Sequence, residues 1–358
     1  MFDLNSLPIF FLGANNVSGY VSRFGDCFKI EDGWQVWVLK GGPGSGKSSF
    51  MKKAAARLAQ TGHTLFIAPC PADPNSLDAV VSQSRKLMIL DGTAPHPMDP
   101  PVPGAAGRLI DTGRFWNSRI LSENREKIAA LGRQNTRLHN RAAGYMAAAS
   151  RLLGESRRIA QEATDLKKAE EFGLALAAKH IPKKGGEPSE QIRFLSGVTP
   201  AGVTYYRSSV RKMCPKVIEI VDDYGAASSA VLSAVRSEAL ARGQAVINCR
   251  CPLRPLDKTD HLILPRLGLA FCTVNRYLAS EETDHRKIHA QRFCDTGMLK
   301  THKHHLNFNR KGAKELLDCA SGLLRDAKSV HDVLEQYYID AMDFDALNNH
   351  CEELLNEI

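Results

Sequence analysis

The chain has 358 residues, of which 43% are hydrophobic and 24% charged. At roughly 100–200 residues per domain, this length predicts two domains, and the composition is that of a globular protein able to bury cores. No run approaches the ~18 apolar residues of a membrane span, and Met1 to Leu12 lacks the features of a signal peptide, so we expect a cytoplasmic protein with no membrane partner. The net charge of +8 (47 Lys and Arg against 39 Asp and Glu) permits an acidic partner without requiring one.

The first predicted strand, Val36 to Leu39, leads into a glycine-rich loop and then a predicted helix, Ser49 to Leu58. The loop, Gly41 to Ser48, matches G-x-x-x-x-G-K-[ST], the phosphate-binding loop. Its glycines let backbone N–H groups turn toward a phosphate, and the helix N-terminus adds positive partial charge. The sequence therefore predicts a site for ATP and Mg²⁺. Its binding residues are Gly41, Gly42, Pro43, Gly44, Ser45, Gly46, Lys47, Ser48 and Ser49. We expect Lys47 to reach the β- and γ-phosphates as a catalytic residue, and the Ser48 hydroxyl to ligate Mg²⁺.

Two further strands are predicted, and the second of them ends in a carboxylate. Thr64 to Ala68 reads as a strand, and Asn75 to Asp78 as a short helix or turn. Leu87 to Leu90 is an apolar run closed by Asp91, a Walker B-type pattern. A carboxylate at the end of a strand beside a phosphate loop can hold Mg²⁺, so Asp91 is predicted as a metal-side catalytic residue. Gly92 follows it, so the adjacent water-activating carboxylate of many ATPases is missing. The nearest alternatives are Asp78, His96 and Asp99.

Thr93 to Gly107 contains five prolines and is predicted as an ordered loop at the ligand-binding end of the strands. A helical arm is predicted at about 109–180, as two or three long helices. Between Arg108 and Lys168 there are 13 Lys and Arg against 6 Asp and Glu. The main interpretation is a solvated helical face, and the alternative is a surface for nucleic acid or a protein partner.

After the linker Lys183 to Pro188, the sequence repeats itself. Phe194-Leu195-Ser196-Gly197 resembles Phe11-Leu12-Gly13-Ala14 at an offset of 183, and Val217 to Ile220 takes the place of Val36 to Leu39 at an offset of 181. Asp111-Thr112-Gly113 returns as Asp295-Thr296-Gly297. A shared register across a whole unit indicates a duplication. The first copy is residues 1–185, and the second is 186–358, with a helical region from about 281–358.

The second copy has lost the features of a nucleotide site. At the offset of 181, Gly41 to Ser48 becomes Asp222 to Ser229, Ser228 replaces Lys47, and Cys272 replaces Asp91. Two aspartates and a missing lysine disfavour a polyphosphate. We therefore expect the second copy to bind no Mg-nucleotide, and to pair with the first copy in a structural or regulatory role. Five arginines are candidates to complete the first site, against an ordinary surface role for each. They are Arg207, Arg211, Arg250, Arg254 and Arg266.

Two other groups suggest metal only weakly. His302-Lys303-His304-His305 has no carboxylate or cysteine at helical spacing, so solvated or partner-facing histidines are the better interpretation. Cys249 and Cys251 form a C-x-C pair, which alone is not a zinc site.

The loop from Lys40 to Lys53, then Ser76-Leu77-Asp78, then Ile89 to His96 with Asp99-Pro100, resembles the bacterial tandem P-loop ATPases. These are two-copy proteins of about this length. The resemblance extends over nearly the whole chain and includes Asp257 to Pro265 in the second copy. In that family the second copy can carry its own Gly-Lys-Ser/Thr loop, and this sequence departs from it there.

The predicted fold is α/β, with two P-loop NTPase-like parallel-sheet domains in tandem, each followed by a helical hairpin or bundle. The first functional hypothesis is a Mg-dependent ATPase with one working site. The second is a small-molecule or nucleotide kinase, in which Thr93 to Gly107 with Arg108 and Arg114 serves as a lid. The third is a nucleotide-gated module that binds nucleic acid or protein through the basic helices.

Overall fold

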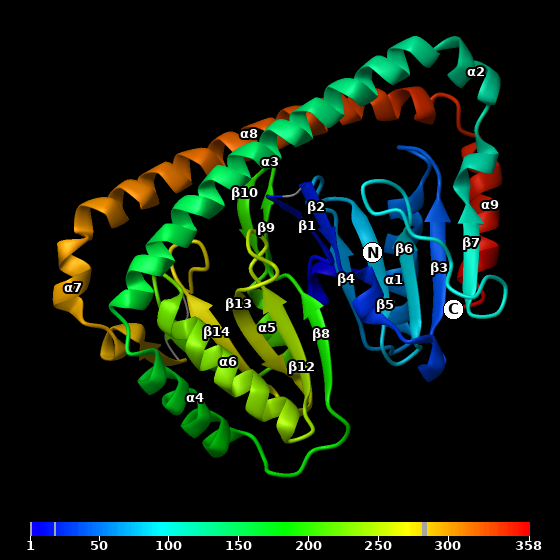
Figure 1. Cartoon of the computed structure of the whole chain (residues 1–358). Coiled ribbons are helices and arrows are strands. Elements are labelled where there is room, and N and C mark those ends of the chain that lie inside the picture. Colours follow the sequence, from blue (N-terminus) through cyan, green and yellow to red (C-terminus); the bar gives the residue numbers. More distant parts are fainter. Residues whose placement is uncertain (1, 18, 281–284) are drawn as a thin grey trace. The chain divides into compact units, whose positions relative to one another are not determined.

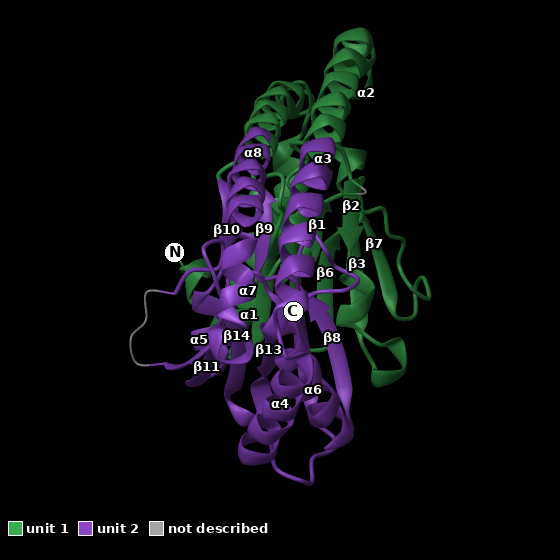
Figure 2. Ribbon diagram, turned by 60° about the vertical axis from the view of Figure 1, so that its left-hand side comes forward, with its two compact units in different colours: residues 1–143, 199–201, 320–358 green, residues 144–198, 202–319 purple. Residues whose placement is uncertain are grey.

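The computed structural model describes residues 2–17, 19–280 and 285–358 (Figure 1). The chain divides into two compact units, each assembled from separate stretches of sequence (Figure 2). Unit 1 comprises Met1–Ala143, Thr199–Ala201 and Ala320–Ile358, and unit 2 comprises Gly144–Val198 and Gly202–Cys319. The two sequence copies and the two compact units are therefore different divisions of the chain.

Unit 1 contains a five-stranded sheet in the order β4-β5-β6-β3-β7. The neighbours β6, β3 and β7 are parallel, whereas β5 is antiparallel to both β4 and β6. Every residue from Val36 to Leu39 in β3, which has a neighbour on each side, is buried, as in a strand covered on both faces. The strands are β3 (Gln35–Lys40), β4 (Leu65–Pro69), β5 (Leu77–Ser82), β6 (Leu87–Asp91) and β7 (Gly107–Asp111).

The α/β class is confirmed, but the expectation of parallel sheets is wrong in part. Only Gln83 to Lys86 separates β5 from β6, and so short a connection joins antiparallel strands. Lys86 adopts a positive φ of 51° in this turn. The helix or turn predicted at Asn75 to Asp78 is a turn at Asn75 and Ser76 only, because β5 starts at Leu77 and all six of its side chains are buried. A strand buried on both faces shows no alternation that would reveal it in the sequence.

Helix α1 (Lys47–Gln60) follows β3 and confirms the predicted strand, loop and helix. Its apolar side chains at helical spacing are all buried, and the helix lies against β4, β5 and β6. Burial of each large apolar side chain contributes roughly 1.5–3 kcal/mol. This attachment fixes the N-terminus of α1 at the carboxyl end of β3. The buried apolar residues are Phe50, Met51, Ala54, Ala55 and Leu58.

Unit 2 contains a six-stranded sheet in the order β15-β11-β14-β13-β12-β8. Strand β13 is antiparallel to both neighbours, and the other pairs are parallel. Helix α6 (Ala226–Ala241) lies against β12 and β13. The strands are β8 (Ser189–Arg193), β11 (Lys216–Val221), β12 (Ala245–Arg250), β13 (Thr259–Leu264), β14 (Leu269–Val274) and β15 (Arg286–His289).

The predicted internal repeat is present in the topology. The order β7-β3-β6-β5-β4 recurs as β15-β11-β14-β13-β12, with β8 added at one edge. A hairpin precedes each sheet: β1 (Gly13–Asn16) with β2 (Gly19–Ser22), and β9 (Ser196–Thr199) with β10 (Gly202–Tyr205). These hairpins confirm the offset of 183 residue by residue.

The last helix of each sequence copy packs in the unit that contains the sheet of the other copy. Helix α4 (Leu166–His180) ends the first copy but packs on α6 in unit 2, and α9 (Phe344–Leu355) ends the second copy but packs on α1 in unit 1. Gly173 allows the close approach of α4, since a Cβ there would lie 2.7 Å from the carbonyl oxygen of Val231.

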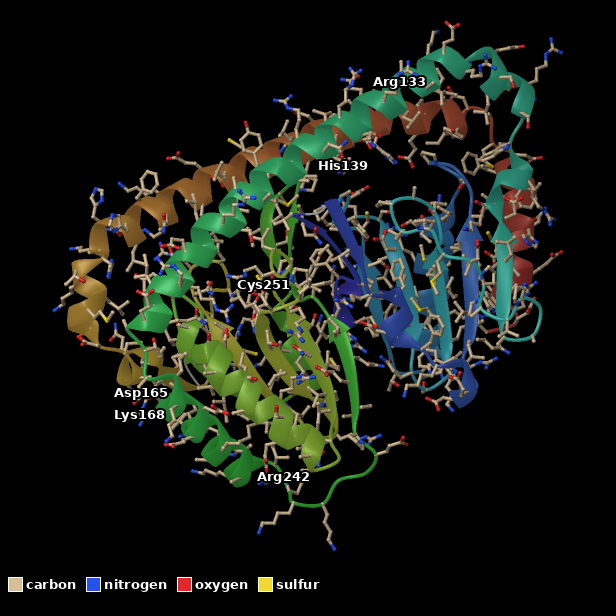
Figure 3. The ribbon with its side chains drawn as sticks, in the orientation of Figure 1. Arg133, His139, Asp165, Lys168, Arg242 and Cys251 are labelled. Carbon is tan, nitrogen blue, oxygen red and sulfur yellow. The ribbon has the colours of Figure 1, made fainter. Side chains whose placement is uncertain are left out.

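Polar groups fix the two ends of α4 (Figure 3). The Asp165 side chain accepts the backbone N–H of Lys168 at 2.9 Å and caps the N-terminus. At the other end, Arg242, the C-cap of α6, donates to the carbonyl oxygen of Ile181 at 2.6 Å. The exchanged helix is therefore held by side chains as well as by apolar contact.

The remaining helices are α2 (Ser118–Glu123), α3 (Arg125–Glu162), α5 (Ser208–Met213), α7 (Thr296–Thr301) and α8 (Lys303–Ile339). The two regions predicted as helical start differently: β7 and a 3-10 helix (Thr112–Phe115) precede α2, and β15 precedes α7. The start of the second region, Glu281 to Asp284, lies outside the described residues. Among the described helices, none is long and apolar enough to cross a membrane.

Candidate functional site

The loop between β3 and α1 carries a row of backbone donors with no internal acceptor. Gly46 caps α1 with φ of 78°. The N–H groups from Gly44 to Ser49 find no acceptor among the described residues, while Phe50 is the first to bond back, to the carbonyl oxygen of Gly46 at 2.9 Å. Free N–H groups at a helix N-terminus attract an anion. The loop therefore fits a phosphate group.

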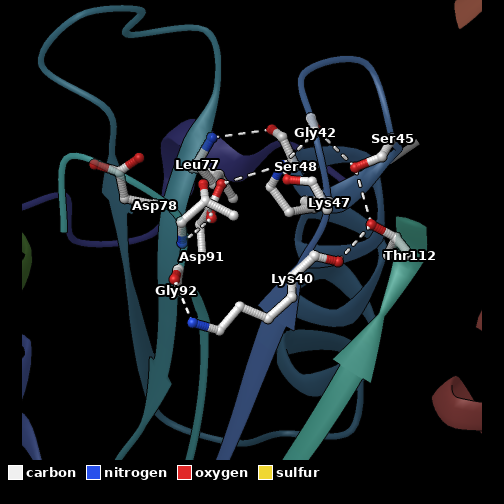
Figure 4. A network of polar contacts seen from close by, with 12 residues as sticks. Lys40, Gly42, Ser45, Lys47, Ser48, Leu77, Asp78, Asp91, Gly92 and Thr112 are labelled. Atoms are coloured by element: carbon white, nitrogen blue, oxygen red, sulfur yellow. Dashed lines mark hydrogen bonds and ion pairs between the residues drawn. The ribbon is translucent and has the colours of Figure 1, made fainter. Parts of the chain in front are cut away.

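Lys47 is held at this loop. The residue is 9% exposed, and its Nζ donates to the carbonyl oxygens of Gly41 at 3.1 Å and Gly42 at 2.7 Å. The same Nζ lies 3.7 Å from Asp91 Oδ2. Figure 4 shows Lys47 and Asp91 together at the loop. A mostly buried ammonium group so placed can neutralise a phosphate.

The hydroxyl groups of Thr112 and Ser45 stabilise the loop, and a third hydroxyl, that of Ser48, contacts β5. Thr112 Oγ1 donates to the Lys40 carbonyl oxygen or to Ser45 Oγ, each at 2.9 Å, and Ser45 Oγ donates to the Gly42 carbonyl oxygen at 2.8 Å (Figure 4). Ser48 Oγ accepts the backbone N–H of Leu77 at 2.9 Å. A hydroxyl oxygen has two lone pairs, so Ser48 retains one for a cation. Sequence reasoning missed Thr112 because its role depends on the pairing of β3 with β7.

Asp91 lies at the carboxyl end of β6, and one of its two carboxylate oxygens already accepts hydrogen bonds. Oδ1 accepts the backbone N–H of Thr93 at 2.9 Å and its hydroxyl at 2.6 Å, which leaves Oδ2 toward Lys47. A carboxylate fixed through one oxygen can present the other to Mg²⁺ or to its waters. Thr93 is a second positioning residue that the sequence motif did not reveal.

The three alternatives for water activation have different surroundings. Asp78 is 4% exposed, lies 3.6 Å from His96 Nε2, accepts from the Tyr20 hydroxyl at 3.4 Å, and points away from Lys47 in Figure 4. Burial opposes a charge on His96, but Asp78 outweighs it and raises the pKa of His96. Asp99 is exposed and lies 3.1 Å from Lys40 Nζ. Among the described residues, none of the three carboxylate or imidazole groups contacts the phosphate loop.

The outer side of the loop is covered by the last helices of the chain. A Cβ on Gly44 (φ 67°) would lie 2.8 Å from Ile339 Cγ1 and 3.0 Å from Glu335 Cγ, both on α8. A Cβ on Gly46 would lie 2.8 Å from Leu347 Cδ2 on α9. The loop therefore has no room for side chains at these positions.

In the second copy, a carboxylate occupies the corresponding loop. Asp222 Oδ1 accepts the backbone N–H groups of Tyr224 at 3.1 Å and Gly225 at 2.9 Å, and its Oδ2 accepts that of Ser228 at 2.8 Å. Asp222 is 6% exposed. The chain thus supplies its own anion where a phosphate would need these donors.

The predicted register of the second loop is wrong by two residues. Gly225 caps α6 with φ of 77°, as Gly46 caps α1, so Ala226 corresponds to Lys47. The loop is two residues shorter. In the sheets, Leu39 pairs with Asp91 and Ile220 with Thr273. Thr273, and not Cys272, therefore corresponds to Asp91.

The edge strands β7 and β15 show that the predicted match of Asp111 with Asp295 is also wrong. Lys40 pairs with Asp111, and Val221 with His289. Asp111 therefore corresponds to His289, whereas Asp295 caps α7.

Other predicted residues are engaged elsewhere. Arg207 pairs with the buried Glu219, and Arg254 with Asp257. The histidines His304 and His305 are exposed. Among the described residues, a different group of three side chains has possible metal-ligating atoms within 4.8 Å of one another, but its Asp332 already pairs with Lys328. That group is His331, Asp332 and Glu335.

Comparison with known proteins adds nothing to this geometry: no family model, no curated protein and no solved structure matches the chain.

Proposed function

We propose that the protein is a Mg-dependent ATPase with a single nucleotide site at the loop Gly41 to Ser48. The observation that carries the proposal is the row of N–H groups from Gly44 to Ser49 without an acceptor among the described residues, beside Lys47. In the second copy, Asp222 accepts three of the corresponding N–H groups, those of Tyr224, Gly225 and Ser228. Only the first loop is therefore open to an added anion.

Each side chain has a role in this proposal. The N–H groups bind the phosphates, Lys47 leaves its carbonyl partners to neutralise their charge, and Ser48 and Asp91 Oδ2 hold the metal side. Bound Mg²⁺ would supply charge neutralisation at the phosphates. ATP is preferred over GTP because the first copy carries no guanine-recognition signature.

We favour hydrolysis over transfer to an acceptor. Arg108, a predicted lid residue of the kinase alternative, pairs with Glu357 at 2.6 Å and lies over the Trp37 ring at 5.2 Å. Arg114 lies over the Phe115 ring at 4.7 Å. These contacts hold both arginine side chains away from a role as lid residues.

The test is ATP binding and phosphate release by Lys47→Ala, with Lys52→Ala on the same helix as the matched control. We expect Lys47→Ala to lose turnover and Lys52→Ala to keep it. A Lys47→Ala protein that hydrolyses ATP at the wild-type rate would refute the site. ADP formation only with an added acceptor would favour the kinase, and tight binding without turnover would favour the nucleotide-gated module.

A further inference from the structure

Unit 2 contains a cavity of about 110 Å³, partly open to solvent, at the carboxyl-end edge of its sheet. The loops after β11, β12 and β14 line one side of it, through Tyr224, Cys251 and Tyr277 among others, and the other side is lined by α3 and α8. Cys251 is labelled in Figure 3. The edge where parallel strands end is where α/β proteins bind ligands. A closed cavity of roughly 150 Å³ accepts benzene; this smaller cavity opens to solvent, so it suits an apolar body no larger than about one ring, with the rest of the molecule at the opening.

The charges around the cavity favour an anion. Five cationic side chains line it against two carboxylates, Asp223 and Asp260. The cations are Arg157, Arg254, Lys258, Arg276 and Arg310. Three of these already have partners: Lys258 lies 2.5 Å from Asp260, and Arg254 and Arg157 both pair with Asp257.

The other two cations are available. Among the described residues, no carboxylate lies within ion-pair distance of Arg276, which follows β14, or of Arg310 on α8. Guanidinium groups recognise carboxylates and phosphates through paired hydrogen bonds. Two such groups from different elements at one cavity can hold the head of a small anion.

Two buried donors in the cavity wall also lack an acceptor. Neither the Tyr277 hydroxyl nor Arg157 Nε finds one among the described residues. Burial raises the pKa of Tyr277, so its hydroxyl remains protonated and able to donate. Buried donors left without acceptors are uncommon in folded proteins and indicate an additional partner. Both donors belong to side chains that line this cavity.

We propose that this cavity is a binding site for a small organic anion, with an apolar body about the size of one ring and a carboxylate or phosphate head held by Arg276 and Arg310. The body lies among Leu153, Leu278 and Leu306. The site is distinct from the nucleotide loop because all of its lining residues belong to unit 2. It also explains why the second copy keeps a full sheet without a phosphate loop: the strand-end edge serves another ligand.

The test is calorimetric titration of the full chain with benzoate, phenyl phosphate and neutral benzamide. We expect one or both anions to bind and benzamide to bind at least tenfold more weakly. A tighter benzoate would assign the head as a carboxylate, and a tighter phenyl phosphate as a phosphate. No binding of either anion, or equal binding of benzamide, would overturn the proposal.

Variants locate the binding. Arg276→Gln with Arg310→Gln should weaken the anion about 10- to 100-fold, as expected for charged hydrogen bonds, and Tyr277→Phe should weaken it severalfold without changing any charge. Arg266→Gln, an exposed arginine outside the cavity, is the matched control and should leave affinity unchanged. Unchanged affinity in the double variant, or loss of anion binding in Lys47→Ala, would place the anion elsewhere and overturn the assignment.

Discussion

Asp222 Oδ2 accepts the backbone N–H of Ser228 at 2.8 Å, six residues further along the chain. This bond closes the shortened loop before α6, and Oδ1 accepts two further N–H groups. A carboxylate that accepts several backbone donors acts as a fixed internal anion. The loop of the second copy therefore has its own acceptor for these N–H groups and needs no bound anion.

Asp222→Ala should therefore destabilise unit 2. Three backbone donors lose their acceptor, which costs about 3 kcal/mol, given about 1–3 kcal/mol for each buried unsatisfied group and some access of water. Hydrogen exchange of the β11 and α6 amides measures the loss. Asp223→Ala, at the exposed neighbouring carboxylate, is the control and should change stability by less than about 0.5 kcal/mol. Equal protection in both variants would mean that Asp222 does not organise the loop.

Gly44→Ala should disturb the phosphate loop more than its backbone conformation alone explains. A Cβ at Gly44 meets Ile339 and Glu335, whereas a Cβ at Gly62, which also has positive φ, meets nothing within 4 Å. Gly62→Ala should cost about 1 kcal/mol from strain only, and Gly44→Ala about 1–3 kcal/mol more from overpacking.

Tryptophan fluorescence during urea unfolding is a suitable measurement, because all three tryptophans lie in unit 1. They are Trp34, Trp37 and Trp116. If the two alanine variants unfold at the same urea concentration, the contact of the loop with α8 does not constrain Gly44.

Asp91→Asn should slow ATP hydrolysis about 10²-fold or more while nucleotide still binds, because the loop donors and Lys47 remain. Thr93 can still bond to the asparagine oxygen, so the position of the side chain is kept. Phosphate release at saturating Mg-ATP is the measurement. Asp99→Asn is the control and should retain activity within a few-fold, since Asp99 is exposed and contacts Lys40. Wild-type turnover in Asp91→Asn would remove Asp91 from the site.

His261 should make unit 2 sensitive to acid. The ring is 1% exposed, stacks on Tyr205 with 5.3 Å between centroids, and burial lowers its pKa to about 4. The unfolded chain takes up the proton near pH 6.5 and the folded chain only near pH 4, so stability falls as pH drops through this window, by at most about 3 kcal/mol.

His261→Phe keeps the stacked ring and removes the titration. Its stability relative to wild type should therefore improve by about 2–3 kcal/mol between pH 7 and pH 4.5, as measured by exchange of the β13 amides. The exposed His304→Gln should follow wild type across the same range. A parallel pH dependence of His261→Phe and wild type would contradict the neutral buried state of His261.

The local pattern around the loop could be read from the sequence because it depends on neighbouring residues. Val36 to Leu39, Gly41 to Ser48 and the apolar spacing of α1 are all short-range signals, and the structure bears out that strand, loop and helix. Asp91 also lies where the pattern placed it, beside Lys47.

What could not be read depends on pairing between distant segments. A constant offset cannot reveal that the loop before Gly225 is two residues shorter, so Ala226 rather than Ser228 matches Lys47. Thr112 reaches the loop only because β7 pairs with β3. The antiparallel β5 is buried on both faces and lacks the alternation that identifies a strand.

The exchange of α4 and α9 has a consequence for biosynthesis. Gly46 and Leu347, which contact each other at the phosphate loop, are separated by 347 − 46 = 301 residues. Chains are made from the N-terminus, and domains usually fold as they emerge. Here the first sheet must wait for the last helix before α1 is covered, and such long-range closure slows folding. A nascent or truncated chain that ends before Phe344 therefore carries the full glycine-rich motif and still lacks a complete site.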